Sequence, residues 1–502
     1  MGILIFFAVA SIFAPIITPY SPTADTELAG FMAAPSWLRN LPSGGLLSEN
    51  FKAVEKPGFA TLESLQEWNI TTEQDPSMFT IQHSSSIGYP DGTGPGSIAV
   101  TFRREETGKV YGNVSVKIAK EFYYPYKGLP NSFKGLIALL VKGTETEAFL
   151  HVPVRVEVFI QKVGGGKWTI WPANDPGRLY EVLAPFNYYG EITSVTPTWT
   201  VSRATPASPA SQIDSRAYSV ISLVKDPLRT IFKSSELPCS YIFGAEIKFY
   251  DKYQPNKQVE TTVYVDDLYL NFAGTSFGIL GTDATGRDIF SQLIYGARIS
   301  LYLGLLSSIF AVVVGLFVGL AAGYLGKVVD AVLMRFTDML LVLPTLPLLI
   351  VVVAVLGPSL NNLILILGAL GWMGFARTVR SQVLTLRERP FVEAAKSIGA
   401  GKIHIIIRHI LPNVMSLTYV SLATAVPGNI VAEAALSWLG FYDPNVMTWG
   451  RMLYDVQVEA GAISNWWWVL PPGIAIALIA LSFILIGYAL DEVLNPRLRM
   501  RR

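Results

Sequence analysis

Five long stretches of the chain contain no charged side chain, and they limit the possible folds more than any other feature. They cover residues 1–24, 299–326, 339–376, 410–432 and 460–490. A helix needs about 20 mostly apolar residues to cross the hydrocarbon core of a bilayer. The stretch 339–376 is too long for one crossing, and Leu356-Gly357-Pro358-Ser359 interrupts it, so we expect two antiparallel helices there. The sequence therefore predicts a polytopic α-helical membrane protein with about six transmembrane helices.

The region between the first two apolar stretches is polar and rich in turn residues. Short runs in it alternate apolar and polar side chains, as residues 152–160 do. A period of two residues is typical of strands that are buried on one face. We therefore expect a first transmembrane helix at residues 1–19 and an inserted β-sandwich domain at residues 20–280. Residues 263–268 (VYVDDL) resemble the last strand of some jelly-roll carbohydrate-binding modules. Residues 281–502 would hold five further transmembrane helices.

The composition excludes several classes of protein. The 39 basic and 38 acidic side chains leave a net charge of +1, which provides no electrostatic attraction for nucleic acid. Charged residues make up 15% of the chain, against roughly a quarter in an ordinary soluble domain. The single cysteine excludes an internal disulfide bond, and the four scattered histidines show no metal-ligand spacing. We expect a lipid bilayer around the chain, no metal site and no nucleic-acid partner.

The basic residues indicate which loops face the cytoplasm, because cytoplasmic loops are enriched in lysine and arginine. Seven basic residues lie between positions 377 and 408, whereas the loop 440–461 carries only Arg451. The C-terminal tail adds Arg497, Arg499, Arg501 and Arg502. This asymmetry predicts a multi-pass protein of the plasma membrane with a cytoplasmic C-terminus and with residues 20–280 outside the cell. The first apolar segment lacks the positive flank of a signal peptide, so we expect it to be retained, with cleavage after the Ala8-Val9-Ala10 pattern as the alternative.

The segment EAAKSIGAGKIHIIIRHILP at residues 393–412 is the most informative part of the sequence. Four apolar residues can share one helical face there, namely Phe391, Val392, Ala395 and Ile398. Gly399 and Gly401 permit a sharp bend with positive φ. A second amphipathic piece at residues 403–410 leads to Pro412, which is tolerated at the start of a membrane helix. The pattern predicts a short, basic pair of helices that suits insertion into a groove on a partner.

Several motifs of the chain occur together in one known family. Glu393-Ala394-Ala395, with Gly399 six residues after Glu393 and with Leu411-Pro412, resembles the EAA loop of ABC importer permeases. That family prefers an aliphatic residue where His409 stands, but its dipeptide/oligopeptide branch commonly reads RHILPN there, as this chain does. Further matches are GTD at 281–283, GRD at 286–288, YGARIS at 295–300, ALSWLG at 435–440, WG at 449–450 and NPRL at 495–498. The chain is thus similar to the C-type permease subunit of the dipeptide/oligopeptide (nickel) branch, with a large extracellular insert.

The resemblance implies a type I ABC importer permease fold and a set of partners. A second homologous permease would complete the path, two ATPase subunits would bind ATP and Mg, and an extracellular binding protein would deliver the substrate. The EAA coupling loop, at about residues 390–412, would pass ATPase motion to the membrane helices through Glu393, Ala394, Ala395, Gly399, His409, Leu411 and Pro412. The chain has no Gly-x-x-x-x-Gly-Lys-Ser/Thr phosphate loop. We therefore expect a non-catalytic subunit with no cofactor of its own.

Three features outside this loop invite a functional or a structural interpretation. Glu433 lies in or near an apolar segment, where an ionisable group is costly, so it is a candidate pathway or gate residue or a structural hydrogen-bond partner. Asp266-Asp267 could contribute to a calcium site, although two acids fall short of a six-oxygen cage. A set of charged residues could pin a helix near the outer membrane face, namely Asp283, Arg287, Asp288 and Arg298.

The sequence leaves alternatives open for both the substrate and the broad functional class. Peptides, oligosaccharides and nickel are all compatible with the resemblance. The main alternative function is a membrane-anchored extracellular carbohydrate-binding or adhesion protein, in which the β region would be the active part. An ion-coupled secondary transporter would need acidic relays within the membrane, and only Glu433 offers itself for that role.

Overall fold

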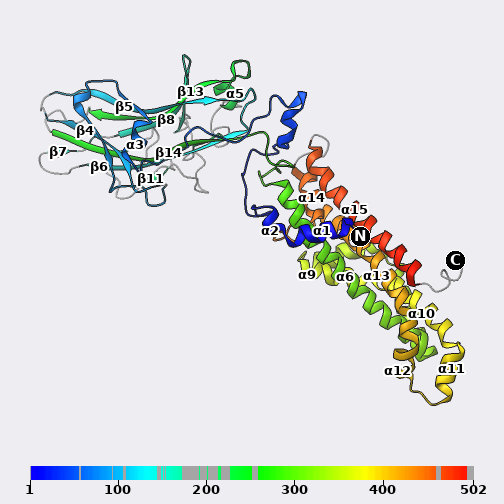
Figure 1. Cartoon of the computed structure of the whole chain (residues 1–502). Helices are drawn as coiled ribbons and strands as arrows, with labels where there is room; N and C mark the ends of the chain where they lie inside the picture. The colour runs from blue at the N-terminus through cyan, green and yellow to red at the C-terminus, as the bar shows by residue number, and fades with distance from the viewer. Residues whose placement is uncertain are drawn as a thin grey trace. The chain divides into compact units, whose positions relative to one another are not determined.

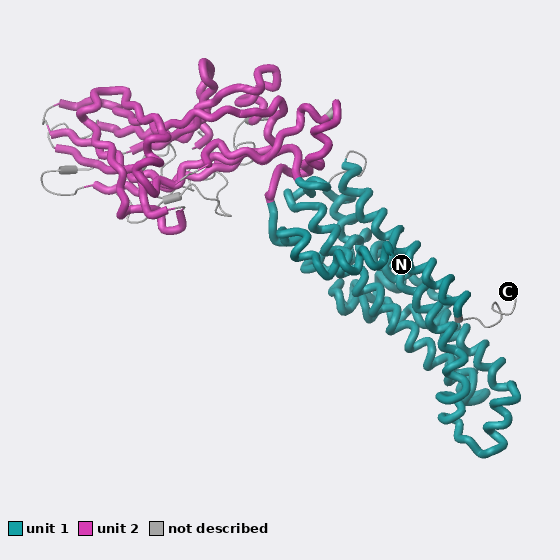
Figure 2. The backbone as a smooth tube through the Cα atoms, in the orientation of Figure 1, with its two compact units in different colours: residues 1–26, 278–502 teal, residues 27–277 magenta. Residues whose placement is uncertain are grey.

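The computed structural model describes residues 2–55, 58–92, 94–105, 109–143, 149–150, 152, 154–171, 191–192, 200–201, 213–215, 227–251, 258–459 and 465–494. The chain divides into two compact units, one formed by Met1–Thr26 with Gly278–Arg502 and one formed by Glu27–Phe277 (Figure 2). The motif at 495–498 and the tail residues Arg497, Arg499, Arg501 and Arg502 lie outside the described residues.

The unit Glu27–Phe277 contains two β-sheets (Figure 1). The larger sheet has the strand order β11-β6-β14-β4-β3, with β1 and β7 paired to β14 and β12 paired to β6. The smaller sheet has the order β10-β8-β13-β5-β2, with β9 paired to β8. The strands are β1 Phe51–Lys52, β2 Asn69–Thr72, β3 Phe79–Ser84, β4 Ser97–Arg104, β5 Gly112–Tyr124, β6 Ser132–Gly143, β7 Phe149–Leu150, β8 Val154–Lys162, β9 Lys167–Trp171, β10 Glu191–Ile192, β11 Thr200–Val201, β12 Ile213–Asp214, β13 Cys239–Asp251 and β14 Gln258–Ala273. The short helices of this unit are Ser36–Asn40, Pro42–Gly44, α3 Leu62–Gln66, Pro76–Met78, α5 Pro227–Ile231 and Ser234–Glu236.

The alternating apolar residues of these strands form one core between the sheets. Val156 and Val158 of β8 stand opposite Ile247 and Ala245 of β13, and all four side chains are fully buried. The same core includes Val263 of β14 in the larger sheet. Directly opposed residues of an antiparallel pair lie on the same face. The alternation in the sequence thus corresponds to a two-sheet β domain.

One buried ion pair connects the two sheets. The Nε of Arg104, at the end of β4, lies 3.1 Å from a carboxylate oxygen of Asp251, at the end of β13, and each side chain is 1% exposed. The backbone N–H of Tyr111 also donates to this carboxylate, at 3.0 Å. A buried charge pair is stable only while both partners are present.

The first of the adjacent acids Asp266 and Asp267 accepts hydrogen bonds from the backbone of the β domain. Asp266 is fully buried and accepts hydrogen bonds from the N–H groups of Tyr89, at 2.8 Å, and of Asp267, at 2.8 Å. Burial raises the pKa of Asp266 to about 6, against the lowering effect of these N–H donors. Among the described residues, no group of three or more His, Cys, Asp or Glu side chains could hold a metal ion.

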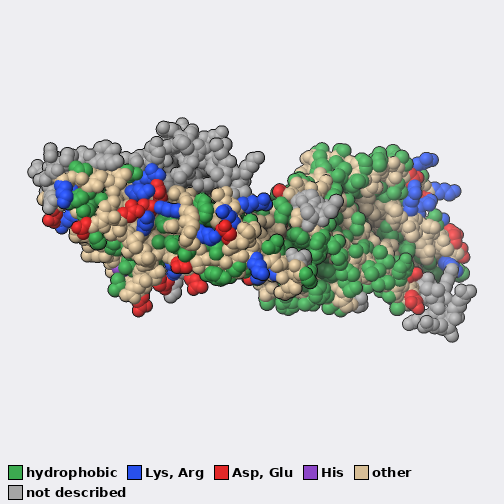
Figure 3. All heavy atoms as spheres, turned by 90° about the horizontal axis from the view of Figure 1, so that it is seen from above, with side chains coloured by type: hydrophobic (Ala, Val, Ile, Leu, Met, Phe, Trp, Pro, Cys, Tyr) green, Lys and Arg blue, Asp and Glu red, His purple; other side chains and the backbone are tan. Residues whose placement is uncertain are grey.

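The second unit is helical. Its helices are α1 Gly2–Ile12, α2 Ala14–Ile17, α6 Ile289–Leu325, α7 Lys327–Val342, α8 Thr345–Leu356, α9 Leu360–Gly371, α10 Met373–Arg387, α11 Pro390–Ser397, α12 Lys402–Ile405, α13 Leu411–Trp438, α14 Trp449–Glu459 and α15 Trp466–Leu494. Hydrophobic side chains cover much of its surface in Figure 3. Examples are Phe317 and Val351, which are 67% and 60% exposed. Such a surface is stable only in contact with lipid or partner chains.

The described residues supply four or five candidate membrane spans. Four are single runs, Ile289–Leu325, Leu360–Arg387, Lys402–Trp438 and Trp466–Val493, and a fifth is the pair α7 and α8, bent by 90°. The predicted first crossing at residues 1–19 is shorter than expected, because α1 ends at Ile12. The separate short helix α2 then starts at Ala14 and has Pro15 in its first turn, where proline is accepted, unlike in a helix interior. The interruption predicted at 356–359 is confirmed, because α8 ends at Leu356 and α9 starts at Leu360.

We expect Arg104→Ala to destabilise the β domain by about 3–5 kcal/mol, because Asp251 would stay buried without its counter-charge. Amide hydrogen exchange of β4 and β13, measured on the full chain, checks this. The neighbouring Arg103, which is 50% exposed and lies 3.1 Å from Glu105, provides the control. Arg103→Ala should cost less than about 1 kcal/mol. Equal exchange rates in the two variants would contradict a special role for the buried pair.

Candidate functional site

The predicted EAA loop forms a compact turn at one end of the helical unit (Figure 1). Helix α10 ends at Arg387, and α11 starts at Pro390, whose missing N–H is not needed in a first turn. Helix α12 continues into a π-helical turn, Ile406–Ile410, and then into α13. Pro412 lies in the first turn of α13, as the sequence predicts.

Part of the loop is held firmly against the helical bundle. Val392 and Ala395 of α11, with Ile405 and Ile410, are buried in one hydrophobic cluster. The other buried members of that cluster come from α6, α10 and α13, namely Leu320, Tyr324, Val379, Val383, Leu386 and Val414. The loop is therefore anchored to three long helices at once.

A different set of apolar side chains points away from the bundle. Phe391 and Ile398, expected on the same face as Val392 and Ala395, are 42% and 86% exposed. The expectation of one shared face is therefore wrong, because Ile398 follows the end of the eight-residue α11 and Phe391 lies beside the buried stripe. Ile403 and Ile407 are 72% and 59% exposed. We call Phe391, Ile398, Ile403 and Ile407 the apolar knob.

The bend between α11 and α12 uses one of the two expected glycines. Gly399 has φ +82°, a left-handed conformation that residues with a Cβ rarely adopt. Its N–H donates to the carbonyl of Lys396, at 3.0 Å, and closes the helix. Gly401 has φ −67° and precedes α12 in an extended conformation, so the expected positive φ is wrong for this residue.

The remaining predicted site residues lie around this bend. Glu393, Ala394 and Pro412 are exposed, and Ala395 is buried. The carboxylate of Glu393 makes no hydrogen bond or ion pair with any described residue, so it is open to a partner. His409 is half-buried, with its ring centroid 6.4 Å from that of Phe391. Leu411, also half-buried, is the first residue of α13.

Three glycines of α6 allow a close approach to α10 that our sequence analysis did not identify. A Cβ on Gly319 would lie 2.6 Å from the Cβ of Val379, and one on Gly323 would lie 2.7 Å from the Cβ of Val383. Gly315 lies equally close to the backbone at the start of α10. The four-residue spacing of these glycines is the small-residue pattern of membrane helix interfaces, and it could have revealed the contact.

Two ion pairs, also missed in the sequence, connect α7 to α10. Arg380 binds Asp330 through both its Nε and an Nη, the latter at 2.6 Å. Arg377 binds Asp338 through its guanidinium. Paired arginine and aspartate side chains are the usual way for charges to be tolerated near a membrane-embedded helix. They couple α7 to the helix that leads into the loop.

Glu433 is buried within α13 and holds the start of α14. One carboxylate oxygen accepts hydrogen bonds from the hydroxyls of Ser437 and Thr448, each at 2.7 Å. The hydroxyl of Thr448 in turn accepts the N–H of Arg451, at 3.0 Å, in the first turn of α14. The second carboxylate oxygen, Oε2, has no hydrogen-bond partner among the described residues. This geometry supports the structural interpretation of Glu433.

A polar cluster around Asp283 fastens α14 to the start of α6. Asp283 accepts the Nε of Arg287 and the amide of Gln292, each at 2.6 Å. Arg287 also lies 3.4 Å from Asp455 of α14. Asp288 caps α6 by accepting the N–H of Ser291, at 2.9 Å. Arg298 is exposed and has no hydrogen bond or ion pair with any described residue, so its expected part in this cluster is wrong.

We expect Gly399→Ala to destabilise the loop by about 1–2 kcal/mol, because a Cβ opposes the left-handed conformation. Faster amide exchange at residues 393–405 of the full chain would reveal the effect. Gly401→Ala is the matched control, since its φ is ordinary and its Cβ would meet open space. The control should change stability by less than about 0.5 kcal/mol. Indistinguishable exchange in the two variants would contradict the assignment of strain to Gly399.

We also expect the attachment of α14 to depend on pH through Asp455. Burial raises the pKa of Asp455 to about 6, although Arg451 and Arg287 favour its charged form. This value lies above the ordinary 3.8, so the folded protein holds the proton on Asp455 more tightly than the unfolded chain does. The resulting contribution to the free energy of unfolding is present below about pH 4 and is lost as the pH rises through about 6. Asp455→Asn should remove this decline in the thermal unfolding midpoint, whereas Asp491→Asn, at an exposed position of α15, should retain it. If the Asp455→Asn protein showed the same decline as the wild type, the assignment would be refuted.

Comparison with known proteins gives the family of the helical unit. Residues 311–500 match the family described as "Binding-protein-dependent transport system inner membrane component". The dipeptide transport system permease protein DppC of Bacillus subtilis is 37% identical over 220 residues, which are 44% of this chain and 68% of that protein. The oligopeptide transport system permease protein OppC of Haemophilus influenzae is 33% identical over 293 residues, which are 57% of this chain and 93% of that protein. The chain therefore belongs to the DppC/OppC-type family of ABC transporter permeases and is a non-catalytic, multi-pass membrane subunit of such a transporter.

Proposed function

We propose that this permease imports short peptides and that the loop at residues 390–412 couples it to its ATPase subunits. The support for the substrate is that the curated relatives matched over most of their own length include dipeptide and oligopeptide permeases. The support for the coupling role is the apolar knob, which a firmly anchored loop exposes at one end of the helical unit.

The apolar knob carries the coupling proposal. Ile398, Ile403 and Ile407 are all more than half exposed, whereas their neighbours Val392, Ala395 and Ile405 are buried. Burying an aliphatic side chain of this size in a partner's groove stabilises the complex by about 1.5–3 kcal/mol. Glu393 and Ala394, exposed beside the knob, complete the docking surface with one carboxylate and one small residue. Gly399, His409, Leu411 and Pro412 shape the bend that presents it.

The proposed assembly contains this chain, a second homologous permease, two ATPase subunits and an extracellular binding protein. In this assembly, closure of the ATPases moves the knob, and the buried face of the loop passes the movement to α6, α10 and α13. Glu433 has a structural part in this assembly, because it keeps α14 attached to α13 through Ser437 and Thr448. The ATPase subunits bind the ATP and Mg. This chain provides only the surface on which those subunits dock.

The proposed topology has six crossings, with α1 and α2 together contributing the first. The basic loop between α10 and α13 would face the cytoplasm, and the β domain would lie outside the cell. An outside location agrees with the two-sheet fold, because a β domain that buries its apolar residues between two sheets is stable in water. The coupling loop and the β domain would then lie on opposite sides of the membrane.

The coupling role predicts a specific loss of activity. Ile398→Arg and Glu393→Arg should each lower peptide uptake at least about tenfold, which corresponds to about 1.4 kcal/mol of lost docking. ATP hydrolysis by the assembled transporter should persist while losing its stimulation by substrate. Uptake of a labelled dipeptide and phosphate release, measured on the same proteoliposomes, separate the two activities.

The control for this experiment is Glu459→Arg, the same charge reversal at an exposed position of α14. It should leave uptake and stimulated hydrolysis as in the wild type. Normal uptake by the Ile398→Arg and Glu393→Arg transporters would refute the coupling role. Loss of uptake in the control would show that charge reversal is harmful at any exposed site.

The topology predicts different labelling of two introduced cysteines. In a chain carrying Cys239→Ser, which removes the single native cysteine, Lys233→Cys in the β domain should react with a membrane-impermeant maleimide on intact cells. In a chain expressed without its proposed ATPase partners, which would cover the apolar knob, Ile398→Cys should react only after the membrane is permeabilised. Both positions are exposed, at 61% for the side chain of Lys233 and 86% for Ile398, so a lack of labelling would not come from burial within the fold. Labelling of Ile398→Cys on intact cells would overturn the proposed orientation.

A further inference from the structure

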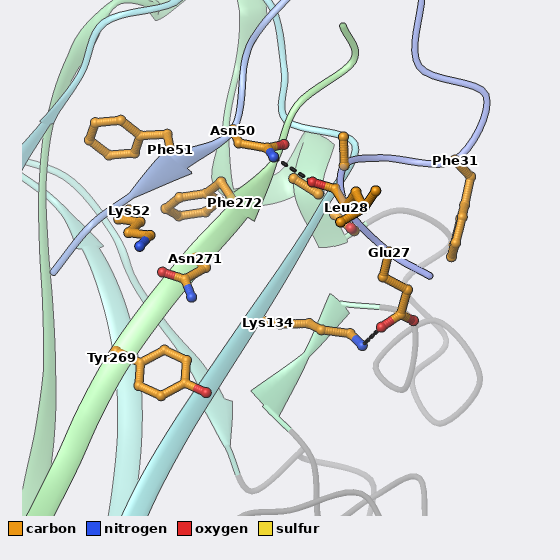
Figure 4. Close-up of a pocket in the computed structure, with 13 residues that line it drawn as sticks. Glu27, Leu28, Phe31, Asn50, Phe51, Lys52, Lys134, Tyr269, Asn271 and Phe272 are labelled. Carbon is orange, nitrogen blue, oxygen red and sulfur yellow. Dashed lines mark hydrogen bonds and ion pairs between the residues drawn. The ribbon is translucent and has the colours of Figure 1, made fainter. Parts of the chain in front are cut away.

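The β domain contains a cavity of about 370 Å³ on the outer face of its larger sheet. Its floor is a row of three side chains in register across adjacent strands, because Lys52 of β1 pairs with Asn271 of β14, and Asn271 pairs with Lys134 of β6. Tyr269, two residues before Asn271, lies on the same face of β14. Figure 4 shows these side chains at the surface of the sheet.

The opposite wall of the cavity is the segment 27–32, and its backbone is held in an unusual conformation. Glu27 and Met32, at its two ends, have φ values of +60° and +51°. Non-glycine residues in this region are strained and persist only where the surroundings hold them. The strained segment provides Glu27, Leu28 and Phe31 to the cavity.

Two side-chain amides and one backbone contact hold this wall in place. Asn50 donates to the carbonyl of Leu28 at 2.6 Å. Asn131 bonds both the N–H and the C=O of Phe31, at 3.1 and 3.2 Å. The N–H of Gly30 donates to the carbonyl of Gly274 at 3.0 Å, and a Cβ on Gly30 would collide with Asn131 and Gly274. A wall that is both strained and fastened along its length is a preformed feature and not a loose linker.

The charges of the cavity are separated along the floor. Lys134 forms an ion pair with Glu27 on the far wall, and that pair stays partly exposed. Lys52, at the other end of the row, is exposed and has no ion pair with any described residue. The amide of Asn271, between them, is half-buried and has no hydrogen-bond partner among the described residues. One end of the cavity is therefore a lysine without an ion pair among the described residues. The other end contains the carboxylate of Glu27 together with Lys134, which also lies 3.8 Å from the carboxylate of Asp214.

We propose that this cavity binds a short zwitterionic peptide of two or three residues, as a capture site of the permease chain itself. Lys52 binds the peptide's terminal carboxylate, Glu27 binds its terminal ammonium, and the amide of Asn271 bonds its backbone. Two strand spacings separate the ends of the floor, about 10 Å, and a tripeptide extends over a similar length. Tyr269 and Phe31 provide aromatic surface for an apolar side chain.

The charge pattern favours a peptide over a neutral sugar. Aromatic rings and amides suit both ligands, but a sugar would leave the uncompensated cation of Lys52 without a matching group. A zwitterion satisfies a cation at one end and a carboxylate at the other, which a polyol does not. The inference rests on the proposed peptide function, and it adds a second place at which the substrate is held.

The test uses the full chain in nanodiscs and tritiated Ala-Phe-Ala as the probe, with binding measured by equilibrium dialysis. Lys52→Gln should weaken binding at least about tenfold, because it removes the charge that faces the peptide's carboxylate. Lys233→Gln, an exposed lysine of the same unit outside the cavity, should bind as the wild type does. Gly30→Ala should also weaken binding, because it displaces the wall. N-acetyl-Ala-Phe-Ala-amide, which lacks both charges, should bind weakly and equally to the wild type and to Lys52→Gln.

Three results would overturn the inference. They are the absence of Ala-Phe-Ala binding to the wild type, equal affinity of the wild type and Lys52→Gln, and displacement of the probe by cellobiose at the same concentration as by unlabelled tripeptide. A measurement of uptake of the same tripeptide by the complete transporter distinguishes failure of the capture-site proposal from failure of the proposed function. Uptake without cavity binding contradicts only the capture site, whereas absence of peptide uptake contradicts the substrate itself.

Discussion

The close contact between α6 and α10 is the interaction on which the helical unit depends. Lipid offers no hydrophobic drive for helices to associate, so membrane helices rely on close packing of small residues. Gly315, Gly319 and Gly323 bring α6 against Val379 and Val383 of α10 with no room for a larger side chain. The same two valines belong to the cluster that buries the loop. The burial of the loop and the contact between α6 and α10 therefore depend on the same two side chains.

The β domain is inserted in a way that leaves the helical unit intact. Its incoming and outgoing segments are hydrogen-bonded to each other, through Gly30 and Gly274 and through Ala34 and Phe277. Ala34 and Ser276 also form a parallel bridge. An insertion whose two ends lie close together replaces a loop of its host without separating the neighbouring elements. This explains how a permease can carry a domain of this size.

Much of the fold follows from patterns that act over a few residues. The break at 356–359, the start of α13 at Pro412 and the strands with alternating apolar residues are all confirmed, because local turn chemistry and periodicity decide them. The number of spans was harder to predict. Pro15 shortens the first helix, and a 90° bend after Val342 divides one long apolar run in a way that hydropathy alone does not reveal.

The sequence by itself determined where apolar helices, strands and the EAA-like loop lie, since composition and spacing are properties of neighbouring residues. Only the tertiary structure decided which residues of the loop are anchors and which are free. Val392 and Ile398 are similar side chains, yet one is buried and the other is 86% exposed. Likewise, Gly399 has positive φ and Gly401 does not. The physical reason is that burial and backbone strain depend on α6, α10 and α13, which meet the loop only after folding.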